Sequence, residues 1–98
     1  MKFVQIIEVT TTSFDEIEKL HEKWLKDTEG QRTVQSELIC RDRDNPDRYL
    51  IIVEFPSYED AMKNNDLPAT AEIAAAISEL TSTPTVFRNL DLIRVDEG

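Results

Sequence analysis

The sequence predicts a single α+β domain in the order β-α-β-β-α-β, and three observations point to it. Two segments, Phe3–Val9 and Tyr49–Phe55, carry large apolar side chains on both of their alternating faces. Since a strand with one wet face alternates apolar and polar residues, both faces of these strands require cover. Helical stretches with a period near 3.6 residues follow each of them. Two less regular apolar stretches complete a set of four strands.

This order corresponds to the ferredoxin-like split βαβ arrangement, a four-stranded antiparallel sheet with the first and third strands at its centre. The two segments that are apolar on both faces take those central positions. The helices then cover one face, and the other face stays open in a single chain. We therefore predict a homodimer through the helix-free sheet face, in which two copies bury Val4, Ile6, Leu50 and Ile52.

The energies of this association are closely balanced. Burying four such side chains gains about 6–12 kcal/mol, at about 1.5–3 kcal/mol each. Association costs about 4–15 kcal/mol in lost freedom. The edge strands must therefore contribute to the predicted dimer.

The first helix is predicted from Ser13, which forms a capping-box pattern with Glu16. Gly30 ends it. The inner stripe of this helix, at the spacing of residues that face a core, contains Ile17, Leu20, His21, Trp24 and Leu25.

The remaining elements follow from turn and breaker residues. Strands over 33–41 and 49–55 form a hairpin around the polar segment 42–48. Ser57 and Asp60 form a second capping box, which begins a short helix over 58–65. Pro68 breaks this second helix, because its ring cannot continue a helix interior. A further helical piece is expected over 70–80, and the last strand over 86–95.

Composition bounds the class of protein. The 98 residues make one domain, 1–98, with a net charge of −9. Such a charge repels phosphate backbones and anionic lipids, so we expect neither nucleic acid nor a membrane as a partner. Cys40 is the only cysteine, which excludes an intrachain disulfide or a cysteine zinc cluster. We expect it to fill a small buried or half-buried space near the end of its strand. We expect a cytoplasmic protein with no metal and no cofactor.

The segment from Val53 to Met62 contains the end of a strand, Pro56, the Ser57 cap and the start of a helix. It resembles the third strand and second helix of the dimeric α/β-barrel superfamily. The nearer likeness is to its antibiotic-biosynthesis-monooxygenase-like branch, and Asn64–Pro68 and 83–87 continue the layout. The resemblance implies a homodimer with a pocket in each subunit between helices and sheet. Members include cofactor-independent oxygenases of polyketide and quinol substrates, haem-degrading enzymes, isomerases and proteins without known activity, so fold alone selects no function.

Some positions depart from that family. Many relatives have a histidine in the second helix, where this chain has Asn64, and another after the proline, where it has Ala69. A frequent tryptophan at the end of the third strand is Phe55 here. Haem-degrading members have an asparagine on the first strand, near Gln5 or Ile7, so haem degradation is disfavoured. The candidate ligand-pocket residues are Gln5, His21, Trp24, Phe55 and Asn64.

Each candidate has a structural alternative. His21, a weak catalytic candidate, could orient or deprotonate a phenolic ligand, or it could be a half-buried histidine bonded to a carbonyl group. Trp24 could line an aromatic site or simply belong to the core. Gln5 either bonds a neighbouring side chain or faces a pocket. Glu8 and Glu54 share a face and could pair, although binding to arginine at the rim is the simpler interpretation.

Two functions follow. The first is a small-molecule-binding protein resembling cofactor-independent monooxygenases of aromatic, quinone or polyketide-type compounds, in which the substrate itself forms the reactive carbanion. The second is a non-catalytic dimeric ligand-binding or assembly module of the same fold. An effector domain of a transcription regulator ranks third, because we expect no DNA-binding half and the charge has the wrong sign.

Overall fold

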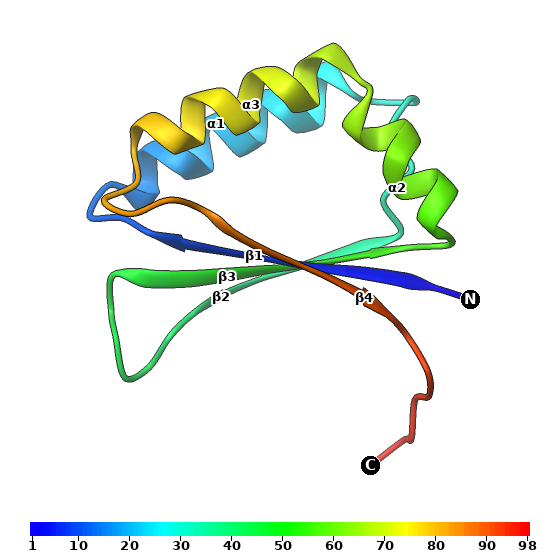
Figure 1. The fold of residues 1–98 in the computed structure, drawn as a ribbon. Helices are drawn as coiled ribbons and strands as arrows, with labels where there is room; N and C mark the ends of the chain where they lie inside the picture. The colour runs from blue at the N-terminus through cyan, green and yellow to red at the C-terminus, as the bar shows by residue number, and fades with distance from the viewer.

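One layer of the molecule is an antiparallel sheet and the other is a set of helices, as Figure 1 shows. The computed structural model describes residues 1–98. Its elements, in chain order, are β1 (Phe3–Thr10), α1 (Phe14–Asp27), β2 (Ser36–Arg41), β3 (Arg48–Phe55), α2 (Tyr58–Asn65), α3 (Pro68–Glu79) and β4 (Val86–Asp91).

The strand order is β2-β3-β1-β4, and all neighbouring strands are antiparallel. The two strands that are apolar on both faces, β1 and β3, therefore lie at the centre. This confirms the predicted ferredoxin-like arrangement, with the second helix divided at Pro68 into α2 and α3.

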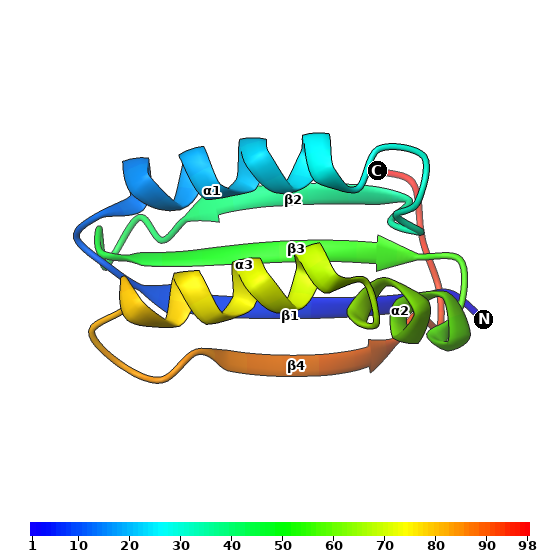
Figure 2. The ribbon, with the colours of Figure 1, turned by 90° about the horizontal axis from the view of Figure 1, so that it is seen from above.

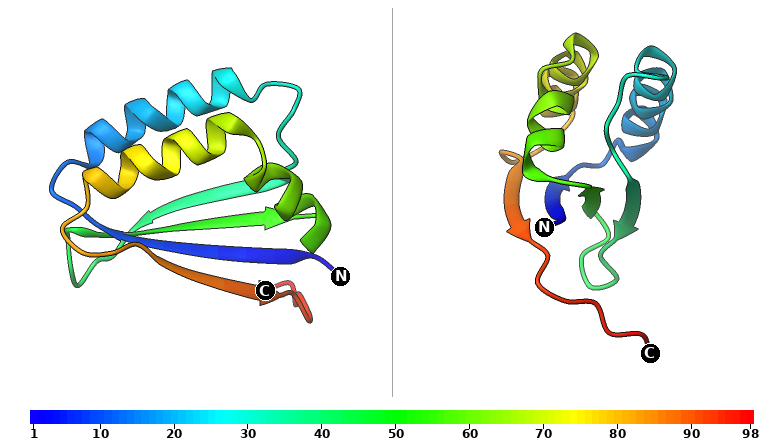
Figure 3. Two further views of the ribbon diagram at one scale, coloured as in Figure 1. Left: turned by 45° about the horizontal axis from the view of Figure 1, so that its top comes forward. Right: turned by 90° about the vertical axis from the view of Figure 1, so that its right-hand side faces the viewer.

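The two faces of the sheet differ in burial. On the helix side, the central strands bury Phe3, Val9, Ile51, Val53 and Phe55, each at most 9% exposed. The alternate residues of these strands face away from the helices, with Val4 beside Glu54 and Ile6 beside Ile52. Its central apolar side chains are only half-buried in the single chain. Figure 3 shows that no helix lies on this face.

The helices do not cover the sheet evenly. Seen from above, α1 runs over β2 and α3 runs beside it over the centre of the sheet, while β4 lies outside both (Figure 2). All six residues of β4 are exposed, including Phe87 at 54%. The helix layer therefore leaves the β4 side of the interior open.

The two predicted helix caps have different outcomes. The Ser57 side chain accepts a hydrogen bond from the Asp60 amide at 3.1 Å, as the second capping box predicts. Ser13 is the N-cap residue of α1 as expected, but its side chain makes no capping hydrogen bond, so the first capping box is wrong. Instead, the Ser13 amide donates to Thr11 Oγ1 at 2.9 Å.

Four boundaries differ from the predicted ones by two residues or more. Helix α1 ends at Asp27, with Thr28 as its C-cap residue, before the predicted end at Gly30. Helix α3 begins at Pro68 rather than Thr70, because a proline in the first turn lacks only an N–H that would have no partner there. Strand β2 begins at Ser36 rather than residue 33. Strand β4 ends at Asp91 rather than residue 95, because its partner β1 begins at Phe3, opposite Asp91. A single hydrogen bond, from the Leu92 amide to the Lys2 carbonyl, extends the pairing.

None of the helices has the length and apolar character needed to cross a membrane.

Candidate functional site

A cavity of about 110 Å³ lies between the helices and the covered face of the sheet. Its walls come from β1, α1, β2, β3, α2, α3 and the loop before β2. They comprise Gln5, Ile7, His21, Trp24, Val34, Glu37, Ile51, Val53, Phe55, Asn64, Asn65, Thr70, Ile73 and Ile77. A wider cleft of about 440 Å³ shares Gln5, Ile73 and Ile77 with this cavity and adds Phe87 and Asn89 of β4. The cavity thus adjoins a wider cleft on the side that the helices leave uncovered.

The five residues expected to form a pocket all line this one cavity: Gln5, His21, Trp24, Phe55 and Asn64. They come from four different elements. The packing of the helices on the sheet brings them together, which the residue spacing alone could not do.

Gln5 bonds a neighbouring side chain and also faces the cavity. Its amide nitrogen donates to Asn89 Oδ1 at 3.0 Å, across the β1–β4 register in which the two residues are opposite each other. The carboxamide oxygen of Gln5 accepts no hydrogen bond within the protein. The two alternatives that the sequence left open therefore both apply.

His21 lies at the side wall of the cavity, where α1 passes over the edge strand. Its Nε2 contacts the Glu37 Oε1 on β2 in an ion pair, rather than a backbone carbonyl. That contact with the Glu37 carboxylate raises the pKa of His21 above its ordinary value, against a lowering effect of burial. The contact with Glu37 therefore shifts the imidazole toward its charged form.

Trp24 belongs to the core and to the cavity wall at once. It is 7% exposed, and its indole N–H donates to Thr70 Oγ1 on α3 at 3.0 Å. The ring also lies near His21, with a centroid distance of 5.8 Å. The Arg32 guanidinium sits 5.8 Å from the Trp24 ring centroid, within cation–π range.

Asn64 has a buried acceptor without a partner. The residue is 5% exposed, and its Oδ1 makes no hydrogen bond in the structure. Leaving such a group unpaired costs about 1–3 kcal/mol. Phe55, 2% exposed at the end of β3, gives an apolar surface in the same cavity. A ligand with a hydrogen-bond donor on an apolar body would match both residues.

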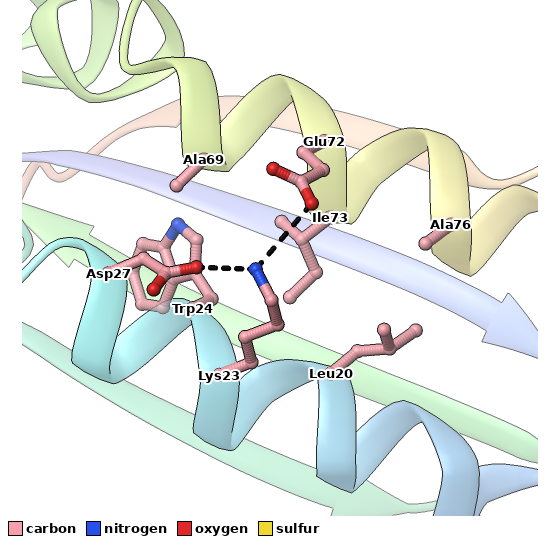
Figure 4. Close-up of a pocket in the computed structure, with 8 residues that line it drawn as sticks. All are labelled: Leu20, Lys23, Trp24, Asp27, Ala69, Glu72, Ile73 and Ala76. Atoms are coloured by element: carbon pink, nitrogen blue, oxygen red, sulfur yellow. Dashed lines mark hydrogen bonds and ion pairs between the residues drawn. The ribbon is translucent and has the colours of Figure 1, made fainter.

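A second, smaller hollow of about 40 Å³ lies between α1 and α3. Figure 4 shows Lys23 reaching from α1 toward Asp27 of its own helix and Glu72 of α3. The Lys23 Nζ is 2.6 Å from Asp27 Oδ2 and 3.5 Å from Glu72 Oε1. Of these two ion pairs, only Lys23–Glu72 joins the two helices, and it does so weakly because both side chains are exposed.

Glu8 and Glu54 do not form a carboxylate pair. In the register of β1 and β3, Glu54 is opposite Val4 and Glu8 is opposite Leu50, a separation of about 13 Å along the strands. Glu8 binds Arg88 at 3.4 Å, as the simpler interpretation predicts, whereas Glu54 accepts a hydrogen bond from Ser36 at 2.6 Å. Both lie on the face away from the cavity.

Cys40 is exposed, so the expectation that it fills a buried or half-buried space is wrong. It lies on edge strand β2 opposite Leu50, on the helix-free face of the sheet. No group of three or more histidine, cysteine, aspartate or glutamate side chains is arranged to hold a metal ion.

Three polar residues of the cavity were not foreseen: Glu37, Asn65 and Thr70. Glu37 could have been predicted from the alternation of residues in β2. It points to the same side of the sheet as Ile39 and pairs with buried Val53. Nothing in the helical pattern distinguishes Asn65 or Thr70 from ordinary polar residues near a helix break.

No protein-family model and no curated protein sequence matches the chain. Solved structures do match it in fold. SnoaB, a cofactor-independent oxygenase from Streptomyces nogalater, aligns with a TM-score of 0.80 at 14% identity over 96% of this chain and 95% of its own. A proposed antibiotic biosynthesis monooxygenase from Caulobacter crescentus aligns with a TM-score of 0.82 at 11% identity, covering 95% and 91% of the two chains.

A further antibiotic biosynthesis monooxygenase aligns with a TM-score of 0.76 at 13% identity, covering 96% of this chain and 100% of its own. The resemblance predicted from the sequence is thus confirmed at the level of the fold. Sequence identities this low support a shared fold but not a shared activity.

Proposed function

We propose that the cavity binds a small hydroxylated aromatic or quinone-type compound, and that the protein acts on it as a cofactor-independent oxygenase. The observation that carries this proposal is the buried, unpartnered Oδ1 of Asn64 in the cavity wall. The shared fold with SnoaB, itself a cofactor-independent oxygenase, adds support.

A ligand hydroxyl would supply the donor that Asn64 lacks. Buried polar groups are nearly always hydrogen-bonded, so an exception in a cavity wall marks a place for a ligand. The surrounding surfaces of Trp24, Phe55 and Val53 suit the face of an aromatic ring. The cavity and the adjoining cleft together have the size of ordinary ligand sites.

A cavity with few catalytic groups can still support an oxidation in which the substrate itself is the reductant. An activated methylene loses a proton to water, and the carbanion transfers two electrons to dioxygen in single steps as a C–O bond forms. The peroxide anion then takes a proton back from the hydronium ion. The resulting hydroperoxide loses water and leaves a carbonyl, so that one methylene and one dioxygen give one carbonyl and one water. Excluding bulk water from the cavity protects the reactive intermediates.

His21 has a different role in this scheme from a general base. Because its contact with Glu37 raises the pKa of His21, the imidazole is better suited to donate a hydrogen bond to a substrate oxygen than to remove a proton. Of the two roles considered from the sequence, orienting the ligand is the one we propose.

The alternative is a non-catalytic dimeric ligand-binding or assembly module. The pairing of His21 with Glu37 favours it, since it leaves no free acid or base in the cavity. Oxygen consumption distinguishes the two functions.

We further propose a homodimer through the helix-free face. In addition to the half-buried central residues, that face exposes Leu38 at 59%, Val86 at 39% and Leu90 at 42%. These edge residues supply the apolar area that the central four could not provide alone. A cytoplasmic location remains a prediction from the sequence.

The test uses anthrone, which carries a methylene of the required kind and is converted to anthraquinone. We expect the protein to accelerate anthraquinone formation with one dioxygen consumed per anthrone, and Asn64→Leu to lower the rate at least about tenfold. Lys63→Leu, on the exposed part of the same helix, is the matched control. Binding without oxygen uptake would leave the non-catalytic alternative, and absence of both would contradict the proposal.

A further inference from the structure

His21 and Glu37 meet where α1 crosses the edge strand of the sheet, and both side chains line the cavity. They are mostly buried, with side-chain exposures of 23% and 18%. No other ion pair or hydrogen bond joins α1 to β2. His21 also borders a groove on the outer side of α1, so the pair forms part of the wall between the cavity and that groove.

The contact determines which ring nitrogen of His21 remains available. Nε2 contacts the Glu37 carboxylate, so Nδ1 is the ring nitrogen left to meet a ligand. In the neutral imidazole with its proton on Nε2, Nδ1 is an acceptor. In the imidazolium, Nδ1 is a donor. The protonation state of His21 therefore decides whether a ligand must offer it a donor or an acceptor.

The charges around His21 favour the imidazolium. Contact with Glu37 raises the pKa of His21 most, and the charge of Glu22 on α1 raises it further, while burial and Arg32 lower it. Glu18 of α1 lies in the outer groove beside the ring. The polar residues that face the cavity from the remaining elements, Gln5, Asn64, Asn65 and Thr70, are uncharged. Glu37 is thus the one carboxylate in the cavity wall.

We propose that Glu37 is a positioning residue that holds His21 as an imidazolium, so that the cavity prefers hydroxyaromatic ligands that carry one ionised oxygen. The ionised oxygen accepts from His21, and a second, neutral hydroxyl donates to Asn64. This inference rests on the proposed function, because it specifies the ligand of the same cavity. It predicts that acidic hydroxyaromatic compounds bind as anions even though the protein has a net charge of −9.

Two probes separate the charge of the ligand from its shape. 4-Nitrocatechol carries one ionised and one neutral hydroxyl slightly above neutral pH, whereas catechol is uncharged. Binding is measured by the fluorescence of Trp24, the only tryptophan in the chain. His21 is the only histidine, so a single imidazole signal in proton NMR reports its pKa in the same samples.

Glu37→Gln is the principal variant, because it keeps the shape of the side chain and removes the charge. At a pH about one unit above the ordinary value for histidine, we expect the preference for 4-nitrocatechol over catechol to fall by about tenfold. The NMR titration should move to lower pH. Glu37→Asp, which keeps the charge with a shorter reach, should give an intermediate pKa and an intermediate preference.

Glu22→Gln is the matched control, with the same loss of charge beside His21 but outside the cavity wall. It should leave the ligand preference within about twofold of the wild type. An unchanged His21 pKa in both Glu37 variants would overturn the positioning role while ligand binding persists. A lowered pKa with an unchanged preference would overturn the ligand class. If neither probe binds the wild type, the proposed function itself is wrong.

Discussion

The indole N–H of Trp24 donates to the hydroxyl oxygen of Thr70 at 3.0 Å, and this bond joins α1 to α3 directly above the sheet. Both residues line the cavity. The hydrogen bond therefore holds the two helices in the relative position that forms the cavity walls.

Removing the acceptor should expose the cost of an unpaired indole. Thr70→Val keeps the shape of the side chain but leaves the buried Trp24 N–H without its partner, and we expect a loss of about 1–3 kcal/mol in the free energy of unfolding. Urea denaturation measures it. In the Trp24→Phe background the same substitution should cost much less, since no donor is left unpaired. Equal costs in the two backgrounds would show that the bond contributes nothing.

Asn64→Leu should stabilise the protein while weakening ligand binding. The substitution removes a buried acceptor without a partner, and we expect the free energy of unfolding to rise by about 1 kcal/mol. The same substitution should lower the affinity for a hydroxyaromatic ligand about tenfold. Denaturation and fluorescence titration on one preparation check both. A less stable variant with unchanged affinity would mean that Asn64 is a structural residue.

The stability of the fold should depend on pH through His21. Its pKa is raised in the folded protein, mainly by Glu37, so the stabilisation is fully present below about pH 6.5, the ordinary value. It is lost as the pH rises through the folded-state pKa. We therefore expect the free energy of unfolding to fall over that interval in the wild type and to vary less in Glu37→Gln. An identical dependence in the two proteins would contradict the role of the pair.

A charge on the helix-free face should dissociate the proposed dimer. Ile52 lies between Ile6 and Leu38 at the centre of that face, so Ile52→Lys would bury two unpaired ammonium groups in a two-fold interface. We expect the dimer dissociation constant to rise at least about 100-fold in sedimentation experiments. Gln31→Lys, an exposed position after α1, makes the same charge change and should leave the mass unchanged. A monomeric wild type would exclude this interface altogether.

The sequence predicted the architecture well, because the apolar pattern of β1 and β3 could be satisfied only at the centre of a covered sheet. Pro68 likewise marked the division of the second helix. The end of β4 could not be predicted from its own residues, since it depends on where β1 begins on the neighbouring strand. The capping of Ser13 failed for a similar reason: Thr11 bonds its amide.

The cavity was predicted only in part. His21 and Trp24 were identifiable from the inner stripe of one helix, and Gln5 from its interruption of an apolar strand. The Glu37 partner of His21 was missed, because strand β2 has weak patterning and the contact depends on how α1 crosses it. The lack of a partner for Asn64 is a property of the packed structure and has no signature in the sequence.

A crystal structure with bound 2-naphthol would show whether the cavity binds a hydroxyaromatic ligand through Asn64, since this compound offers one hydroxyl on an apolar aromatic body. We expect the ring between α3 and the sheet, with its hydroxyl oxygen within about 3.2 Å of Asn64 Oδ1. A ring bound elsewhere, or a cavity that stays empty at saturating ligand with Asn64 still unpaired, would contradict this expectation.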